Sequence, residues 1–214
     1  MSIGIIGAGS LGSTIARLLA NNNIKATIAN NRGPASLVAL VKDLGTNIEA
    51  GTAEEAARAD IVIVAVRWAD VGNALNGLPA WNGRVVVDAT NAVVFLAPDS
   101  PDRKDTSNPL AGLGIKPIDL RGKQSSMIFS TLAPGARVVK AFNHVSAPGL
   151  LQPKVSGGTR VLFYSGDDAA AKADVRKLIE QTGHAPIDLG PLAVGAALAS
   201  APFGPLATAS LIKI

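Results

Sequence analysis

The sequence SIGIIGAGSLGSTIARLLAN, residues 2–21, predicts a strand, a glycine-rich turn and a helix in direct succession. Ser2–Ile6 is a short apolar run closed by glycines, as in a buried strand. Apolar residues then recur at helical spacing over Leu11–Asn21. The turn between them is a Gly-x-Gly-x-x-Gly motif, formed by Gly7, Gly9 and Gly12.

Each glycine of this motif has its own physical purpose. Gly7 permits the tight turn, Gly9 lets a pyrophosphate approach the backbone, and Gly12 lets the helix pack against the strand. The backbone amides of Ser10 and Leu11 then point at the phosphates, with the helix dipole behind them. Because the motif joins a predicted strand to a predicted helix, we interpret it as a dinucleotide site and not as a turn without a ligand.

The end of the second predicted strand, Lys25–Ala29, indicates which dinucleotide is preferred. NAD sites carry an Asp or Glu there, which holds the ribose 2′-hydroxyl. Here NNRGP follows over residues 30–34, and the first carboxylate of the chain is Asp43. The side chain of Arg32 would attract a 2′-phosphate, which favours NADP, and the alternative is that Arg32 is only a solvated turn residue. The further hydrogen-bond donors are Asn30, Asn31 and Ser36.

The order of elements predicts an α/β fold of the Rossmann type, a doubly wound and mainly parallel sheet. The first five strands are predicted at 2–6, 25–29, 48–50, 61–66 and 84–88. Helices are predicted at 11–21, 34–44, from the Thr52/Glu55 capping box onward, and at 71–78. Later strands are predicted at 137–142, 161–165 and 186–189, and later helices at 125–133 and 169–182, capped by Asp167 or Asp168.

Two segments depart from this alternation. Pro98–Gln124 is polar, has prolines at 98, 101, 109 and 117, and is expected to be a long loop. Leu189–Ile212 has 24 residues without a charge, long enough to span a bilayer, but Pro202 and Pro205 would interrupt the span. We expect two short buried helices there instead, which cover the acceptor side and form a homodimer interface.

Domain organisation follows from the same pattern. We expect an NADP-binding Rossmann domain over residues 1–145 and a small C-terminal α/β region over 146–214. The second region would complete the sheet, the acceptor cleft and the homodimer interface. With 214 residues, a chain of this size buries enough surface to need no metal or disulfide.

Composition excludes several classes of function. Apolar residues make up 48% and charged residues 17%, which excludes a disordered chain. There is no cysteine for thiol catalysis or thiolate sites, and two histidines are too few for a histidine metal centre, so no metal is expected. The net charge of +4 is scattered, so no nucleic-acid partner is expected. The first strand follows Met1 directly, so we expect no signal peptide, no membrane anchoring and a cytoplasmic protein.

Four later stretches, together with the glycine loop and NNRGP, carry a resemblance to a known family. They are DIVIVAVRW (60–68), VDATN (87–91), VVKAFNHVSAP (138–148) and the stretch from YSGDD to DLGP (164–191). The chain resembles, over nearly its whole length, the NADPH-dependent reductases of the deazaflavin coenzyme F420. A similar pattern occurs in the cytosolic NADPH domain of six-transmembrane ferric reductases. AFNHVSAP combined with DLGPL is far more specific than the glycine loop.

The resemblance implies hydride transfer between NADP(H) and a flavin-like acceptor, F420 or FMN/FAD, in a cleft at the carboxyl ends of the strands. By motif, Ser10, Leu11 and Gly12 resemble the pyrophosphate contacts, and Asn31 with Arg32 the 2′-phosphate pair. The nicotinamide half and the reacting end would be lined by Val66, Arg67, Trp68, Asn91 and Ala141–Asn143. Trp68 could equally anchor its loop against the core.

Three departures from the family pattern border the acceptor side. Arg67 stands where the family usually has a proline, and the helix start at 125–127 lacks an acidic residue. The loop over 98–124 is also longer than is typical. The resemblance therefore bears least on the identity of the acceptor.

Hydride transfer needs two rings held face to face and little acid–base machinery. His144 is the candidate catalytic residue, as a proton or hydrogen-bond donor to the acceptor ring; the alternative is that it caps the loop after Asn143 or faces solvent. His184 is expected to be structural, and Trp81 a packing residue. Four charged residues could hold an anionic part of the acceptor or simply be solvated: Arg103, Lys104, Arg121 and Lys123.

Two other functions stay open. A small-molecule dehydrogenase or imine reductase usually adds a long helical domain, whereas about 70 residues follow Asn143 here and they alternate strands with short helices. A non-catalytic NADP(H) sensor would bind the dinucleotide and turn nothing over.

Overall fold

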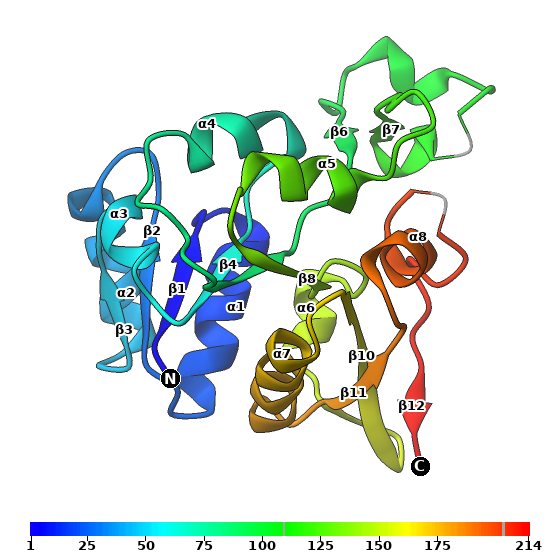
Figure 1. The fold of residues 1–214 in the computed structure, drawn as a ribbon. Helices are drawn as coiled ribbons and strands as arrows, with labels where there is room; N and C mark the ends of the chain where they lie inside the picture. The colour runs from blue at the N-terminus through cyan, green and yellow to red at the C-terminus, as the bar shows by residue number, and fades with distance from the viewer. Residues whose placement is uncertain (109, 203) are drawn as a thin grey trace.

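A mainly parallel sheet forms the centre of the molecule (Figure 1). The structure is a computed structural model that describes residues 1–108, 110–202 and 204–214. Pro109 and Phe203, which fall within the predicted loop and the predicted C-terminal helices, lie outside the described residues. The strands on the main path of the sheet are β1 (Ile3–Ile6), β2 (Ala26–Ala29), β3 (Ile48–Ala50), β4 (Ile61–Val64), β5 (Val85–Asp88), β8 (Arg137–Ala141), β10 (Gly158–Gly166) and β11 (Ala185–Asp188).

The strand order is β11-β10-β8-β5-β4-β1-β2-β3. All neighbours from β3 to β8 pair in parallel. This is the order and direction of a doubly wound Rossmann sheet, so the predicted fold class is confirmed. β10 then joins β8 antiparallel, and β11 joins β10 in parallel, so the C-terminal third of the chain extends the same sheet.

Helices cover both faces of the sheet and bury one apolar cluster on each. One face is covered by α1 (Ser10–Asn21), α2 (Val38–Leu44), α6 (Ala147–Leu150) and α7 (Ala169–Gln181). The other face is covered by α3 (Ala53–Ala56), α4 (Val71–Leu75), α5 (Ser125–Leu132) and a short π-helical turn, η5 (Leu192–Ala196), that continues into α8 (Ala197–Ala199). Short 3-10 turns are η1 (Pro34–Leu37), η2 (Trp68–Asp70), η3 (Pro101–Lys104) and η4 (Ala111–Leu113).

The central strands are short and apolar because both of their faces are covered. Every residue of β1, β4 and β5 is buried. Two predicted helix starts are also confirmed. Thr52 and Glu55 form the capping box of α3, with Thr52 N donating to Glu55 Oε2 at 2.8 Å, and Asp168 accepts from Ala171 N at 2.7 Å to cap α7.

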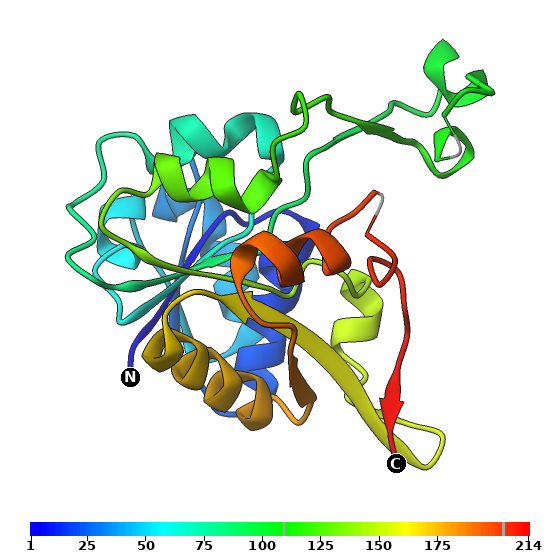
Figure 2. The same ribbon diagram turned by 45° about the vertical axis from the view of Figure 1, so that its right-hand side comes forward.

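The segment predicted as a long loop over 98–124 is partly ordered secondary structure. β6 (Val93–Phe95) pairs antiparallel with β7 (Ile115–Pro117), and η3 and η4 lie between them. We call residues 92–118 the arm, which closes where Ile118 N donates to Ala92 O at 3.0 Å. Figure 2 shows the arm projecting away from the sheet. Pairs such as Arg103 Nε to Ala97 O (2.9 Å) shape it, and hydrophobic periodicity does not reveal such contacts.

The C-terminal segment also differs from the prediction. We call residues 189–214 the tail. Among its described residues, η5 and α8 make one short helical stretch, where two helices were expected, and β12 (Ile212–Lys213) ends it. β12 and β9 (Lys154–Val155) both pair antiparallel with β10. Pro202 and Pro205 follow α8 and cannot donate the hydrogen bonds that a second helix would need. No helix in the described parts of the chain is both long and apolar enough to cross a membrane.

Candidate dinucleotide and acceptor site

The glycine loop has the geometry that the predicted roles require. Gly7 lies in the left-handed region at φ 110°, and a Cβ there would strike the carbonyl of Ala65. A Cβ on Gly12 would strike the carbonyl of Gly7, so the first turn of α1 packs directly on the strand end. A Cβ on Gly9 would meet open space. Gly7 and Gly12 are therefore required by the packing of the fold itself, whereas the space beside Gly9 is free for a bound ligand.

The N-terminus of α1 is open to solvent. Gly9 is its N-cap and makes no side-chain cap, and Gly9 and Ser10 are exposed. The first backbone N–H groups of a helix have no partner within the helix and carry the positive end of its dipole. The end of α1 is thus a ready anion site beside the predicted pyrophosphate contacts.

The turn after β2 divides the four predicted 2′-phosphate ligands into two pairs. Asn30 Nδ2 donates to Ser36 Oγ at 2.9 Å, and Asn30 Oδ1 accepts from Arg32 N at 3.0 Å. These two side chains order the turn. Asn31 and Arg32 are exposed, and within the described ranges the guanidinium of Arg32 has no carboxylate partner. The turn therefore presents a cation to solvent at the carboxyl end of β2.

The segment after β4 lies at the same edge of the sheet because β1, β4 and β5 are parallel. Val66 is half-buried and Arg67 is exposed. Trp68 begins η2 and packs against the apolar cluster that Trp81 also joins. Its contacts favour the anchoring role for Trp68, and Trp81 is a buried packing residue as expected.

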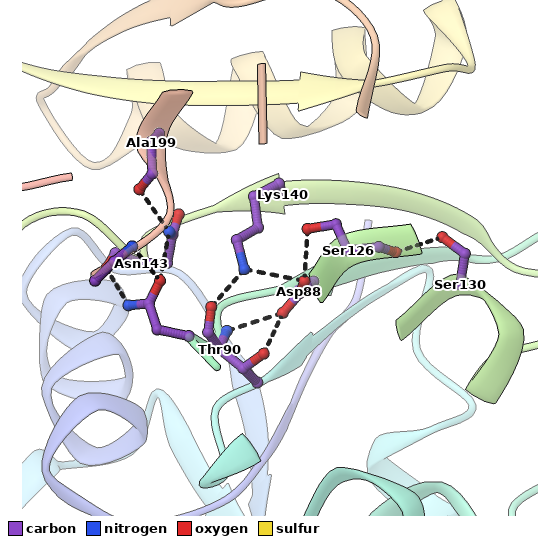
Figure 3. Close-up of polar contacts among 9 residues, drawn as sticks. Asp88, Thr90, Ser126, Ser130, Lys140, Asn143 and Ala199 are labelled. Carbon is purple, nitrogen blue, oxygen red and sulfur yellow. Dashed lines mark hydrogen bonds and ion pairs between the residues drawn. The ribbon is translucent and has the colours of Figure 1, made fainter. Parts of the chain in front are cut away.

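The ends of β5 and β8 are joined by a pair of amides (Figure 3). Asn91 Nδ2 donates to Asn143 O at 2.8 Å, and Asn143 Nδ2 donates to Asn91 Oδ1 at 3.1 Å. The same pair holds the tail, since Asn143 Nδ2 also donates to Ala199 O at 2.9 Å and Ala201 N donates to Asn91 Oδ1 at 3.0 Å. The side chain of Asn91 is thus occupied by protein contacts, while Asn143 Oδ1 is buried without a partner among the described residues.

A buried ion pair that sequence reasoning missed lies beside these amides. Lys140 Nζ is 3.0 Å from Asp88 Oδ2, and the two side chains are 1% and 0% exposed. Burial lowers the pKa of Lys140, and the neighbouring Asp88 carboxylate opposes that shift. Ser126 Oγ donates to the same oxygen at 3.0 Å. The signal that could have found the pair is a charged residue near the C-terminal end of each of two apolar strands, Asp88 in VVVD and Lys140 in RVVKA.

A cavity of about 600 Å³ opens next to the amide pair, between the base of the arm and the tail. Its walls include Ala92 on one side and Ala196, Ala197, Ser200 and Ala201 on the other. Gln124 Oε1 and Ser200 Oγ are buried there without a hydrogen-bond partner among the described residues. The cavity thus combines apolar residues and charged residues of both signs with buried polar atoms that a ligand could satisfy.

Of the four charged residues considered for an anionic acceptor, Lys123 lines the cavity. Lys116, which was not among the four, lines it as well. Arg103 is used inside the arm, where it donates to Ala97 O and Leu96 O. Lys104 and Arg121 are exposed.

His144 does not face solvent and does not line the cavity. It is 4% exposed, its ring packs on Phe163 at 4.7 Å between centroids, and it is absent from the described cavity lining. Burial lowers its pKa to about 4, so it is neutral at pH 7. His184 is buried as well, bonded through Nδ1 to Thr182 Oγ1 at 2.9 Å, as fits a structural residue. Of the remaining predicted residues, Leu11 is half-buried and Ala141 is buried at the end of β8.

No group of three or more metal-ligating side chains occurs in the part of the chain that the structure describes.

Comparison with known proteins gives matches along most of the chain. Residues 2–92 match the model of the family described as NADP oxidoreductase coenzyme F420-dependent. A hypothetical protein, SMa0349, of Sinorhizobium meliloti is 38% identical, with a TM-score of 0.86 over 100% of this chain and 97% of that one. A putative F420-dependent NADP-reductase of an Arthrobacter species is 26% identical, with a TM-score of 0.72 over 90% of this chain and 86% of that one.

One curated relative is the metalloreductase STEAP3 of Rattus norvegicus, 26% identical over 193 residues. The match covers 89% of this chain and 34% of that protein, so the chain spans about a third of the length of this relative.

Proposed function

We propose that this member of the coenzyme F420-dependent NADP oxidoreductases transfers a hydride between NADP(H) and a deazaflavin or related flavin. The observation that carries the proposal is the combination of an open glycine loop with a free cation at the end of the next strand. Both features lie at the carboxyl edge of the sheet, the edge at which β5 and β8 also end.

The dinucleotide half of the site follows from named groups. The amides of Ser10 and Leu11 would hold the pyrophosphate, and Arg32 with Asn31 the 2′-phosphate. When bound, NADPH supplies the hydride. The protein's own task is to fix that end of the cofactor next to the Asn91–Asn143 pair and to exclude water from it.

The acceptor half is proposed to be the cavity between the arm and the tail. Its volume of about 600 Å³ is in the range of small-molecule sites. Gln124 Oε1 and Ser200 Oγ could pair with N–H groups of a planar acceptor, and Lys123 with an anionic extension, whereas Lys116 is already paired with Asp102. The Arthrobacter relative is described as F420-dependent and the rat relative as a metalloreductase, which supports a redox acceptor without choosing one.

Catalysis by a proton from His144 is not part of this proposal. The imidazole is buried against Phe163 and neutral at pH 7. Hydride transfer between two rings needs their alignment more than it needs an acid, so the lack of a nearby histidine is compatible with the reaction.

The test is a steady-state assay of NADPH oxidation with F420, FMN, FAD and a cyclic imine as separate acceptors, with NADH as the matched donor. We expect turnover with a deazaflavin or flavin, and faster turnover with NADPH than with NADH. Turnover with the imine alone would favour the small-molecule reductase. Tight NADPH binding without turnover on any acceptor would favour the sensor.

We also propose a homodimer formed through the tail. Exposed apolar side chains at Val194, Leu211 and Ile212 support a covered face. Light scattering on the whole chain should give twice the monomer mass at micromolar concentration. A stable monomer with a protease-sensitive tail would contradict the interface.

A further inference from the structure

We infer that the buried pair Lys140–Asp88 is a positioning device, which fixes the turn carrying Asn91 and thereby holds the tail in place as a wall of the cavity. The identity of what the cavity binds rests on the proposed function, but the structural steps do not.

The first step is the register of the sheet. Asp88 is the last residue of β5 and lies directly opposite Lys140 on the parallel strand β8. Side chains opposite each other in a sheet point to the same face, so the ammonium and the carboxylate meet beneath α5. Ser126, from that helix, donates to the carboxylate at 3.0 Å. Three elements therefore converge on one buried charge pair.

The second step is the peptide that follows β5. Asp88 Oδ1 accepts from Thr90 N at 2.9 Å and from Thr90 Oγ1 at 2.6 Å. Lys140 Nζ donates to Thr90 O, on the other side of the same residue. Both the N–H and the carbonyl of Thr90 are thus hydrogen-bonded to the ion pair. The plane of the next peptide, and with it the direction in which Asn91 leaves the strand, is set by the ion pair.

The third step is the link from Asn91 to the tail. Asn91 Oδ1 accepts from Ala201 N at 3.0 Å, and Asn143 Nδ2 donates to Ala199 O at 2.9 Å. These bonds bracket Ser200, whose hydroxyl is buried at the cavity. Asn143 stands three residues after Lys140, two residues beyond the end of the same strand. The ion pair is therefore connected to the tail in two ways. On the β5 side the connection runs through Thr90 and Asn91, and on the β8 side it runs through Asn143.

The choice of charges points to orientation and not to stability. A buried ion pair can often be replaced by apolar residues of similar size without loss of stability, because desolvation offsets the attraction between the charges. What apolar side chains cannot do is hold the N–H and the carbonyl of Thr90. In this pair each charged group also makes a hydrogen bond to the backbone of Thr90.

The experiment compares the parent with the double variant Asp88→Leu, Lys140→Met, which leaves no unpaired charge and removes both side-chain contacts to Thr90. Hydrogen–deuterium exchange is followed by mass spectrometry on peptides covering residues 197–207, without any ligand. We expect exchange in these peptides, which include the Ala201 amide, to become at least tenfold faster, while peptides from α1 and β1 keep the parent rates. With an accepted flavin, KM for the acceptor should rise several-fold and the Kd for NADPH should stay within twofold.

The matched control is Asp43→Leu, Arg17→Met, which removes an exposed ion pair between α2 and α1 in the same way. It should leave the tail peptides unchanged. If the double variant at 88 and 140 does not fold, which would appear as lost protection throughout the chain, Thr90→Val removes the hydroxyl bond to Asp88 without leaving an unpaired charge and gives the same comparison with a smaller expected change. Parent-like protection of the tail in either folded variant would overturn the inference. A parent that binds no NADPH would instead refute the proposed function and leave the exchange result to decide the inference.

Discussion

Residues 1–87 and residues 88–214 bury different kinds of side chain. The first region, which the structure describes completely, buries no polar or charged side chain. The second region buries eleven among its described residues. They are Asp88, Thr90, Ser125, Ser126, Lys140, Asn143, His144, Arg160, Ser165, Thr182 and His184.

The two regions therefore differ in the interactions that determine their structure. In the first region hydrophobic burial alone determines which side chains face the interior, because apolar strands lie between apolar helix faces. In the second region each buried polar group needs a particular partner, since an unpaired one costs free energy. The first region presents the dinucleotide loop, and the second forms the cavity. The predictions below test whether the two regions behave as differently as their interiors suggest.

The largest effect is expected at the buried ion pair. Asp88→Ala would leave the Lys140 ammonium without its counter-charge, and such losses cost about 3–5 kcal/mol of the free energy of unfolding. Asp43→Ala, which breaks the exposed pair with Arg17 in the first region, should cost less than about 1 kcal/mol. Urea denaturation of both variants measures the contrast. Equal losses would remove the distinction between the two regions.

Acid should weaken the second region selectively. Burial lowers the pKa of His144 and of His184 to about 4. Between pH 4 and pH 6.5 the unfolded chain therefore binds more protons than the folded one, so the free energy of unfolding falls as the pH falls. Full stability is present above pH 6.5, and the loss by pH 4 approaches about 3 kcal/mol per histidine. Chemical denaturation at several pH values checks this, and His144→Phe should flatten the slope.

Gly9→Val should separate binding from folding in the first region. The new side chain enters open space, so thermal stability should stay near that of the parent. It also occupies the space that a pyrophosphate needs, so NADPH affinity should fall at least about 100-fold, or about 2.7 kcal/mol. Gly12→Ala is the contrasting variant, because its Cβ strikes the Gly7 carbonyl and should lower stability. Unchanged NADPH titration with Gly9→Val would show that the loop holds no dinucleotide.

The smallest effect is expected at the turn after β2. Arg32→Ala removes one charged hydrogen-bonding partner of a 2′-phosphate, which is worth about 1.5–3 kcal/mol of NADPH binding. NADH affinity should barely change, because NADH lacks that phosphate. Isothermal titration with both cofactors measures the gap. Equal affinities in the parent would contradict the NADP preference.

The same division explains what the sequence could predict. β1 to β5 were predicted within two residues at each end, because apolar runs and turn residues are local signals. The candidate loop over Gly7–Gly12 and the exposed Arg32 were found for the same reason. Their binding roles stay predictions.

The second region could be predicted only in part. Strand β8, strand β10 and helix α7 follow from hydrophobic pattern and capping. The Lys140–Asp88 pair and the hold of Asn91 on the tail depend on partners 50 or more residues apart, as with Asn91 and Ala201 at a separation of 110. The sequence marks the charged residues but contains no local signal for which partner each one meets. The arm depends on nearer contacts, such as Arg103 with Ala97, that hydrophobic periodicity does not reveal. The same holds for His144, whose burial against Phe163 depends on where β10 lies.

The pairing of the tail with distant strands also sets an order in time during synthesis. β1 to β8 are complete once residue 141 has been made, whereas the cavity wall and β12 require residues 199–213. At about 5–20 residues per second, the roughly 70 residues between them take about 4–14 s to translate. For that interval the nascent chain carries the glycine loop and the turn at Arg32 without the wall that completes the cavity. On the proposed function, a dinucleotide would meet its half of the site on the ribosome before the acceptor cavity is complete.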